Sequence, residues 1–501
     1  MKSSFYFYVK SFAVSALLLA GLSVVSQKAS AMDVDWSGQF RGEAVMINNY
    51  APLSNVTTGA GGYETTASGS QNARFQTLFL RLRPKLIIND NVSIKSEWWL
   101  GNPITGFYGS DYPGASRADQ RYYNSTFSGG STISAQRFWA EFLTDIGTFQ
   151  VGRAPINWGL GIVHNSGEGV FDRYQSTGDT IRMISKFGNF SLIPAHTKYD
   201  MGNAVGGTCV GGVACAHPTG GATLSEYSLG LRYENQDEDF EGGVNFVRRI
   251  AGAQSESVWL NNLAGGMNTT IWDIYGKKRV GKIDFGIEAP IFKGELIGRQ
   301  YKAFAIATEV KYRASDAWNF FLKAGKVPGQ GNSANNTTDK WSMVYLHPNY
   351  KLGLLMFNYN FGNFGGNNNV NNTTTGSVKS IYDDPITNAR YAALGASLTA
   401  DKWRFTGAFV AATAEKTAQA GQRFFNTRTR AYSAVNAVKD QGSSLGTEVD
   451  LGVALNWDEF TTFGLDAGML WQGDFYKFVN GASDNDLKTV LGIVGSVGVK
   501  F

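Results

Sequence analysis

The sequence predicts an all-β fold, a single transmembrane antiparallel up-and-down β-barrel of about 18–20 strands. Three observations favour it. Apolar and polar residues alternate with a period of two along most of the chain, and short turns alternate with long polar connections. The last segment, residues 487–501, has one uncharged face over its whole length and ends on Phe501. On an exposed sheet edge such a strand would invite aggregation, whereas a closed barrel has no edge.

Composition agrees with one barrel. The chain has 60 Gly, 33 Phe, 22 Tyr and 12 Trp but only 11 Pro, as expected of strands with aromatic ends and Gly-rich connections. Length alone would favour about three domains, but the alternation runs unbroken from residue 34 to the last residue. The formal charge of +4, from 45 basic and 41 acidic residues, implies no nucleic-acid partner.

The first residues predict a signal peptide. Lys2 and Lys10 flank the start of an apolar run, and the small residues Ala29-Ser30-Ala31 form a cleavage site. The apolar run is shorter than the roughly 20 residues of a spanning helix. We therefore expect cleavage after Ala31, with a signal peptide at residues 1–31 and a barrel at residues 32–501.

The first two expected strands show the two faces most clearly. Residues 34–47 alternate an uncharged face with a polar face that carries Arg41. Residues 74–88 place Arg81, Arg83 and Lys85 on one face, which is costly in lipid and natural on a wet inner wall. This basic ladder favours a water-filled lumen.

Later segments repeat the pattern, with charged residues on the face opposite the apolar one. The expected strands and their inward acids include residues 92–100, 224–233 (Glu226), 282–288 (Asp284, Glu288), 304–313 (Glu309), 318–323, 403–409 and 448–457 (Glu448, Asp450). Residues 340–347 and 352–361 could form a further hairpin, turning at Pro348-Asn349. The wall then has about twenty strands, or about eighteen if this segment is tucked into the lumen or stands outside.

The connections are asymmetric. Short turns are expected at residues 89–91, 144–147, 188–189, 235–239, 277–281, 314–316, 401–402 and 458–459, with long polar connections between them. Short turns on the periplasmic side and long loops outside are typical of outer-membrane barrels.

With these features the chain resembles the outer-membrane porins of Gram-negative bacteria. The run from Glu141 to Arg153, EFLTDIGTFQVGR, is similar to the porin hairpin that precedes an inward loop. The resemblance implies that residues 155–178 fold into the pore, where acidic residues of the loop meet a basic cluster across the lumen. The expected pore-lining and constriction residues are Arg41, Arg81, Arg83, Lys85, Arg137, Glu141, Glu168 and Asp172.

The resemblance also implies a function. We expect a water-filled channel in the cell outer membrane for passive diffusion of small hydrophilic solutes and ions, without a cofactor or metal. The expected partners are outer-membrane lipid, lipopolysaccharide and the barrel-assembly machinery, which would read the C-terminal Phe501. A homotrimer is a further expectation.

Other functions stay open. Aromatic residues on the inner face, Phe79, Trp99, Trp139 and Phe321, could line a channel specific for a sugar or an anion, or pack under loops. The Asn-rich tract near residues 362–375 could serve surface recognition. None of the four histidines lies in a catalytic motif, so we expect no enzyme. A TonB-dependent transporter would need a plug domain before the first strand, and the first strand here begins directly after the expected cleavage site.

The two cysteines, Cys209 and Cys215, lie in one loop of an exported chain. A local disulfide is the expected pairing, with a metal site or reactive thiols as alternatives.

Overall fold

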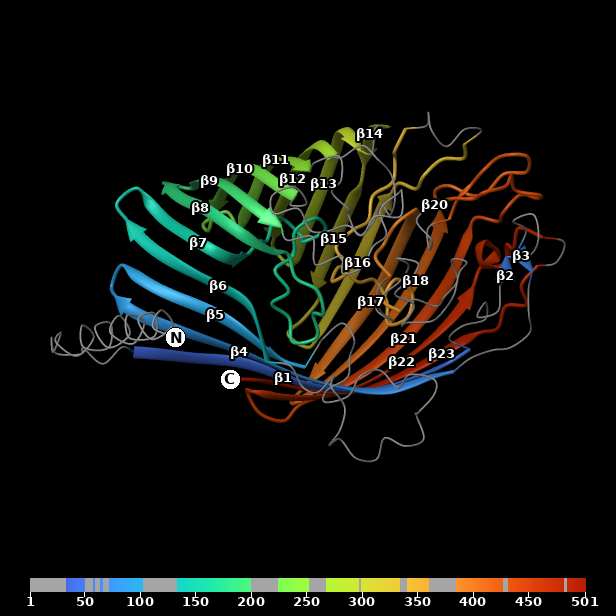
Figure 1. Ribbon diagram of the computed structural model, residues 1–501. Coiled ribbons are helices and arrows are strands. Elements are labelled where there is room, and N and C mark those ends of the chain that lie inside the picture. Colours follow the sequence, from blue (N-terminus) through green and yellow to red (C-terminus); the bar gives the residue numbers. More distant parts are fainter. Residues whose placement is uncertain are drawn as a thin grey trace, which may run out of the picture.

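The strands run up and down in chain order, and each pairs with the next around a closed ring (Figure 1). The computed structural model describes residues 33–49, 57–58, 64–65, 72–101, 133–199, 224–251, 267–296, 299–333, 340–359, 384–426, 431–481 and 484–501. The expected signal peptide and the expected disulfide of Cys209 and Cys215 lie outside these residues. No helix in the described part of the chain is long and apolar enough to cross a membrane.

The wall strands are β1 (Asp33–Asn48), β4 (Ala73–Asn89), β5 (Val92–Leu100), β6 (Ile133–Thr144), β7 (Gly147–Pro155), β8 (Thr177–Phe187), β9 (Phe190–Tyr199), β10 (Leu224–Asn235), β11 (Phe240–Ala251), β12 (Met267–Val280), β13 (Ile283–Leu296), β14 (Arg299–Phe304), β15 (Ile306–Arg313), β16 (Trp318–Val327), β17 (Ala389–Ala400), β18 (Trp403–Ala414), β21 (Ser444–Asn456), β22 (Thr461–Gln472) and β23 (Val490–Lys500). Outside the wall lie the short pairs β2 (Thr57–Thr58) with β3 (Glu64–Thr65) and β19 (Phe425–Asn426) with β20 (Ala431–Tyr432), and the 3₁₀ turn η3 (Asp474–Lys477).

Within the described residues, nineteen wall strands occupy eighteen positions, because β14 and β15 both pair with β13. The division falls at Ala305, whose N–H donates to Pro290 O at 3.2 Å. Proline has no N–H to return the bond, so the ladder is interrupted there. The lower of the two expected strand counts is therefore correct.

The first and last strands close the barrel. β1 pairs with β4 on one side and with β23 on the other, with Phe40 opposite Val499. Phe501 extends this seam: its O accepts from Gly38 N at 2.7 Å, and its N donates to Gly38 O at 3.1 Å. A Cβ on Gly38 would lie 2.5 Å from the Phe501 ring, so the glycine leaves room for the terminal aromatic. The predicted closure of the first strand against the last is confirmed.

The two faces of β1 separate as predicted. Trp36 is 60% exposed on the outer face, whereas Arg41 is 1% exposed on the inner face. The same alternation leaves a large set of apolar side chains exposed around the whole wall, among them Leu231, Trp272, Leu322, Leu394 and Leu465. Such an apolar exterior is what a bilayer covers.

Aromatic side chains gather at the end of the barrel that carries the short turns. Successive ring contacts link Phe187, Phe190, Tyr233 and Phe240 across four strands. Three more groups continue around the same end: Tyr312–Phe320–Trp318, Trp403–Phe405 and Trp457–Phe463. The expected clustering of aromatics at strand ends is confirmed, and it resembles an interfacial girdle.

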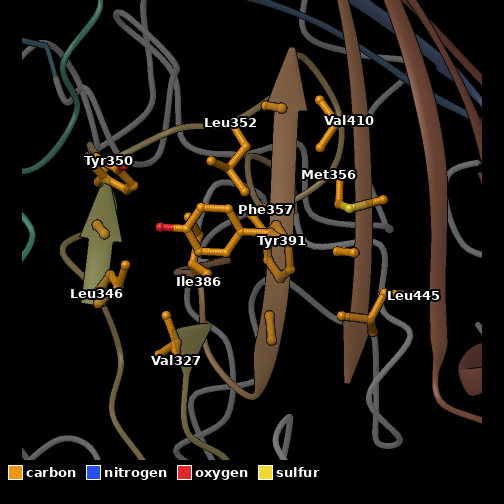
Figure 2. Packing of buried hydrophobic residues seen from close by; sticks show 14 of the residues in the cluster. Val327, Leu346, Tyr350, Leu352, Met356, Phe357, Ile386, Tyr391, Val410 and Leu445 are labelled. Carbon is orange, nitrogen blue, oxygen red and sulfur yellow. The ribbon is translucent and has the colours of Figure 1, made fainter. Parts of the chain in front are cut away.

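The alternative hairpin of residues 340–347 and 352–361 is not part of the wall. Residues 340–359, which we name the inner segment, contain no strand and pack inside the barrel. Figure 2 shows Leu346, Tyr350, Leu352 and Met356 of this segment packed against wall and loop residues such as Tyr391. The apolar residues of the inner segment resemble a strand pattern because they fill a core. Phe357 has a φ of 59°, which lies outside the β region.

Candidate functional site

A loop between β7 and β8 spans the barrel from one wall to the opposite one. We name residues 156–176 the crossing loop. At one side Trp158 Nε1 donates to Asp273 O of β12 at 3.2 Å, and at the other Arg41 of β1 donates to Asp172 O at 2.8 Å. β1 and β12 are nine positions apart in the ring of eighteen. The expected inward fold of residues 155–178 therefore has a definite path across the interior.

Arginines on the wall hold the crossing loop by its carbonyl oxygens. Arg81 Nη1 donates to Gly167 O at 2.7 Å, Arg41 Nη1 also donates to Val170 O at 3.1 Å, and Arg137 Nη2 donates to Ser166 O. The three arginines are at most 2% exposed. They are neighbours because Arg41 and Arg81 project inward from the paired strands β1 and β4, with Arg137 beyond them on β6.

Glu97 is the counter-charge of this cluster. Its carboxylate accepts from Arg83 Nε at 2.9 Å and Arg137 Nη1 at 3.1 Å, and lies 3.6 Å from Arg81 Nε. Trp99 Nε1 also donates to it at 2.7 Å. With 1% exposure, Glu97 neutralises guanidinium groups that burial would otherwise make very costly.

Glu168 completes the cluster from the loop. Its carboxylate lies 2.6 Å from Arg83 Nη2 and 3.0 Å from Arg137 Nη1. Asp172 turns its Oδ2 to the N–H of Gly169 at 2.7 Å, within its own loop. In place of two charge rows facing each other across open lumen, the acidic loop residue is bound directly to the basic wall. The ion pairs therefore hold the loop against the basic wall, and lining of a constriction by these residues stays a prediction.

On other parts of the wall, carboxylates bind the crossing loop and the inner segment by accepting hydrogen bonds from their backbone N–H groups. Glu288 of β13 accepts from Leu160 N and, at 3.5 Å, from Ile162 N. Glu448 of β21 accepts from Leu355 N at 2.7 Å and from Met356 N at 2.6 Å. Both glutamates are 0% exposed. A backbone segment outside regular structure has free N–H and C=O groups. Arginines can therefore donate to its carbonyl oxygens, and glutamates can accept from its N–H groups.

The crossing loop and the inner segment are bound to each other. Ile162 O accepts from His347 N at 2.7 Å, and Asn349 Nδ2 donates to Tyr174 O at 2.6 Å. His347 is half-buried, and its Nδ1 accepts from Asn349 N at 3.2 Å. Burial, reinforced by His164 and Lys351, lowers the pKa of His347 to about 3, so the ring is neutral at ordinary pH.

A cavity of about 270 Å³ lies where the two segments meet β1, β22 and β23. Its lining carries charged residues from every one of these elements except β23: Glu43, Asp172, Arg173, Lys351 and Asp466. A wider space of about 570 Å³ lies near the short-turn end, between the crossing loop and strands β10 to β16. The first cavity is the one bounded by both inward segments.

The remaining predicted residues lie away from the crossing loop. Glu141 is paired with Lys95 at 2.7 Å and also accepts from Trp139 Nε1. Lys85 is half-buried and opposite Lys95 in the register of β4 and β5. Both therefore belong to the wall nearer the short turns, and pore lining at these two positions stays a prediction.

Sequence reasoning missed Glu97, Glu43 and the anchoring roles of Glu288 and Glu448. Glu288 and Glu448 were placed on the inner face by their alternation, but no pattern shows which inward segment they bind. Glu97 shares the inner face of residues 92–100 with Trp99, so its orientation, too, was readable. Its three arginine partners become apparent only from the strand pairing.

The histidines in the described residues make structural contacts. His164 lies 3.0 Å from Arg249 Nη2 and 3.4 Å from Glu226, and His196 stacks on Tyr227. Phe79 packs edge-on against Trp99 beneath the crossing loop, with the guanidinium of Arg41 4.9 Å from its ring. Of the two uses considered for these aromatics, packing under a loop describes Phe79 and Trp99.

No family model matches this chain, and no curated protein does. Among solved structures, it is similar to OccK9 (OpdG) of Pseudomonas aeruginosa, with a TM-score of 0.47, 11% identity, and coverage of 93% of this chain and 99% of that one. It is similar to Pseudomonas aeruginosa OpdK solved with vanillate, with a TM-score of 0.46, 10% identity, and coverage of 94% and 99%. For OmpT, an outer membrane protein of Vibrio cholerae, the TM-score is 0.35, the identity 9%, and the coverage 95% and 99%.

The fold rests on the chain's own strand pairing: a closed antiparallel ring of eighteen positions with an apolar exterior and a polar interior. The chain is a single closed antiparallel up-and-down β-barrel.

Proposed function

We propose that this chain is an outer-membrane channel through which small hydrophilic solutes and ions diffuse passively. The observation that carries the proposal is the crossing loop, which is tied to β1 on one side and to β12 on the opposite side of a closed barrel. A polar, charge-lined interior serves no purpose in a barrel that only anchors itself in lipid. A loop fixed across that interior narrows the passage, and no separate plug domain is needed to do so.

The two ends of the barrel take different roles in this proposal. The short turns and Phe501 face the periplasm, and the long connections face outward, beside lipopolysaccharide. Phe501 is half exposed at the seam, so its ring is available to the barrel-assembly machinery before closure. The expected homotrimer belongs to the same proposal, with the apolar exterior shared between lipid and neighbouring copies.

A substrate-specific channel is the second candidate, and one observation favours it. The inner segment adds a second barrier beside the crossing loop, and the cavity that both bound holds only about 270 Å³. A cavity of that volume accommodates solutes no larger than a small organic ion.

Planar lipid bilayers test the proposal. Purified protein added to one side should produce stepwise current increments, and neutral polymers above a threshold size should leave those increments unchanged. A bilayer exposed to the same detergent without protein is the control. Block by one class of solute would select the specific channel, and a conductance that no solute blocks would select the general one. Folded protein that inserts and gives no current steps would refute both.

A further inference from the structure

Asp466 is one of three carboxylates that line the cavity between the crossing loop, the inner segment and the wall. Asp466 projects inward from β22 at the level where Val494 of β23 lies opposite it. On the other side of β23, Ser496 lies opposite Glu43 of β1. Asp466 and Glu43 therefore belong to one layer near the middle of the barrel wall.

Asp466 differs from its charged neighbours in having no partner. Within the part of the chain that the structure describes, it makes no hydrogen bond and no ion pair. The residue opposite it on β21 is Gly452, and a Cβ there would collide with Asp466 Oδ1. The glycine gives the carboxylate room along the wall, while its half-buried position leaves it open to the cavity.

The other charges of the cavity are already engaged. Arg173 Nη2 donates to both oxygens of Glu43 at 2.7 Å. Asp172 accepts from the backbone of its own loop, and Lys351 Nζ donates to Phe357 O at 3.3 Å. Three carboxylates and two cations leave a net charge of −1, and Asp466 is the carboxylate among them with neither a hydrogen bond nor an ion pair; Arg404 of β18 acts on it only beyond ion-pair distance.

On the basis of the proposed channel, we propose that Asp466 determines ion selectivity and makes the passage prefer small monovalent cations to anions. An unpaired charge in a narrow passage with low-dielectric walls acts strongly on a passing ion, since little water and no counter-ion screens it. The arginine cluster under the crossing loop carries more charge, but its guanidinium groups are occupied by Glu97, Glu168 and backbone carbonyl groups. Its effect on a passing ion is correspondingly smaller.

Reversal potentials under a potassium chloride gradient test this assignment. The unaltered channel should prefer potassium to chloride. Asp466→Asn should lower the permeability ratio about fivefold, and Asp466→Lys should shift the preference toward chloride. Asp458→Asn removes a charge from the turn between β21 and β22, outside the cavity, and should leave the permeability ratio unchanged.

Chemical modification provides a test inside an already folded channel. Asp466→Cys, inserted in the bilayer and then treated with a negatively charged thiol reagent, should regain cation preference. A positively charged reagent should move it toward anions. The unaltered chain, which carries Cys209 and Cys215, receives the same reagents as a control.

The outcomes separate this inference from the channel proposal. Current steps that appear in every variant with one unchanged permeability ratio would overturn the role of Asp466 and leave the channel intact. A shift as large in Asp458→Asn as in Asp466→Asn would also overturn it. The absence of current steps in the unaltered protein would overturn the channel itself.

Discussion

The arginine cluster beneath the crossing loop and the cavity beside β22 use charge in opposite ways. In the cluster, Arg81 and Arg137 are buried, and each is paired with Glu97 or with loop carbonyl oxygens. In the cavity, Asp466 makes no hydrogen bond and no ion pair with any described residue, and Arg404 acts on it only beyond ion-pair distance. Paired charges hold the loop in place, and the unpaired charge is the one a passing solute meets. The number of charges on an inner wall is therefore a poor guide to selectivity until their partners are known.

A second contrast separates the two inward segments, which the wall binds through different backbone groups. The crossing loop is bound to β1, β4 and β6 through its carbonyl oxygens, by arginines. The inner segment is bound to β21 through its N–H groups, by Glu448 and by Asp450, whose Oδ2 accepts from Leu354 N at 3.0 Å. Substitutions on the two sides should consequently release different segments.

The largest effect is expected for Glu97→Gln. The change keeps the shape but removes the charge that neutralises three arginines, so we expect the free energy of unfolding to fall by about 3–5 kcal/mol. Urea unfolding in lipid vesicles measures it. Asp179→Asn is the matched control, because it breaks the exposed Arg153–Asp179 pair, which contributes at most about 1 kcal/mol. Equal losses in the two variants would contradict the anchoring role of the cluster.

Glu448→Ala should act locally. It leaves Leu355 N and Met356 N buried without an acceptor, at a cost of about 1–3 kcal/mol for each group. Amide hydrogen exchange should accelerate at these two residues and remain slow in β17 and β18. Glu448→Gln retains one carbonyl oxygen and should produce a smaller acceleration. Unchanged exchange in the alanine variant would show that Glu448 does not hold the inner segment.

The most gradual effect is expected from pH, through His347. Its pKa of about 3 in the folded state lies below the ordinary value of 6.5, so the unfolded chain binds the proton first. The stabilisation is complete above pH 6.5 and is lost as the pH falls toward 3, by up to about 1.4 kcal/mol per pH unit. The difference in unfolding free energy between the unaltered protein and His347→Gln should show this slope. A difference independent of pH across that window would contradict the neutral state of His347 in the folded protein.

Much of the fold was predictable from the sequence because successive residues of a barrel strand face the apolar exterior and the polar interior in turn. The pairing of residues 34–47 with the C-terminal strand, the aromatic ends and the short turns all followed from that pattern. One expected turn, at residues 277–281, begins too early, because β12 continues to Val280. Residues 340–361 were ambiguous for the same physical reason, since a segment packed inside the barrel alternates much as a wall strand does.

The candidate site was predictable only in part. The sequence identified the ladder of Arg81 and Arg83 and the inward loop with Glu168. The alternation of a strand shows which charges lie on its inner face, and the order of the connections shows which loop follows which strand. The contacts between them depend on which strands pair and on the path of the loop. Asp466 illustrates the limit: its importance follows from the absence of a partner, which only the three-dimensional arrangement reveals.

We propose that the crossing loop, anchored at opposite walls, narrows the passage. The most direct test replaces residues 158–174 with a short Gly-Ser linker between β7 and β8 and compares single-channel conductance with that of the unaltered protein. The account predicts a higher conductance and passage of larger neutral polymers through the shortened variant. An equal conductance and an equal polymer cut-off in the folded variant would contradict it.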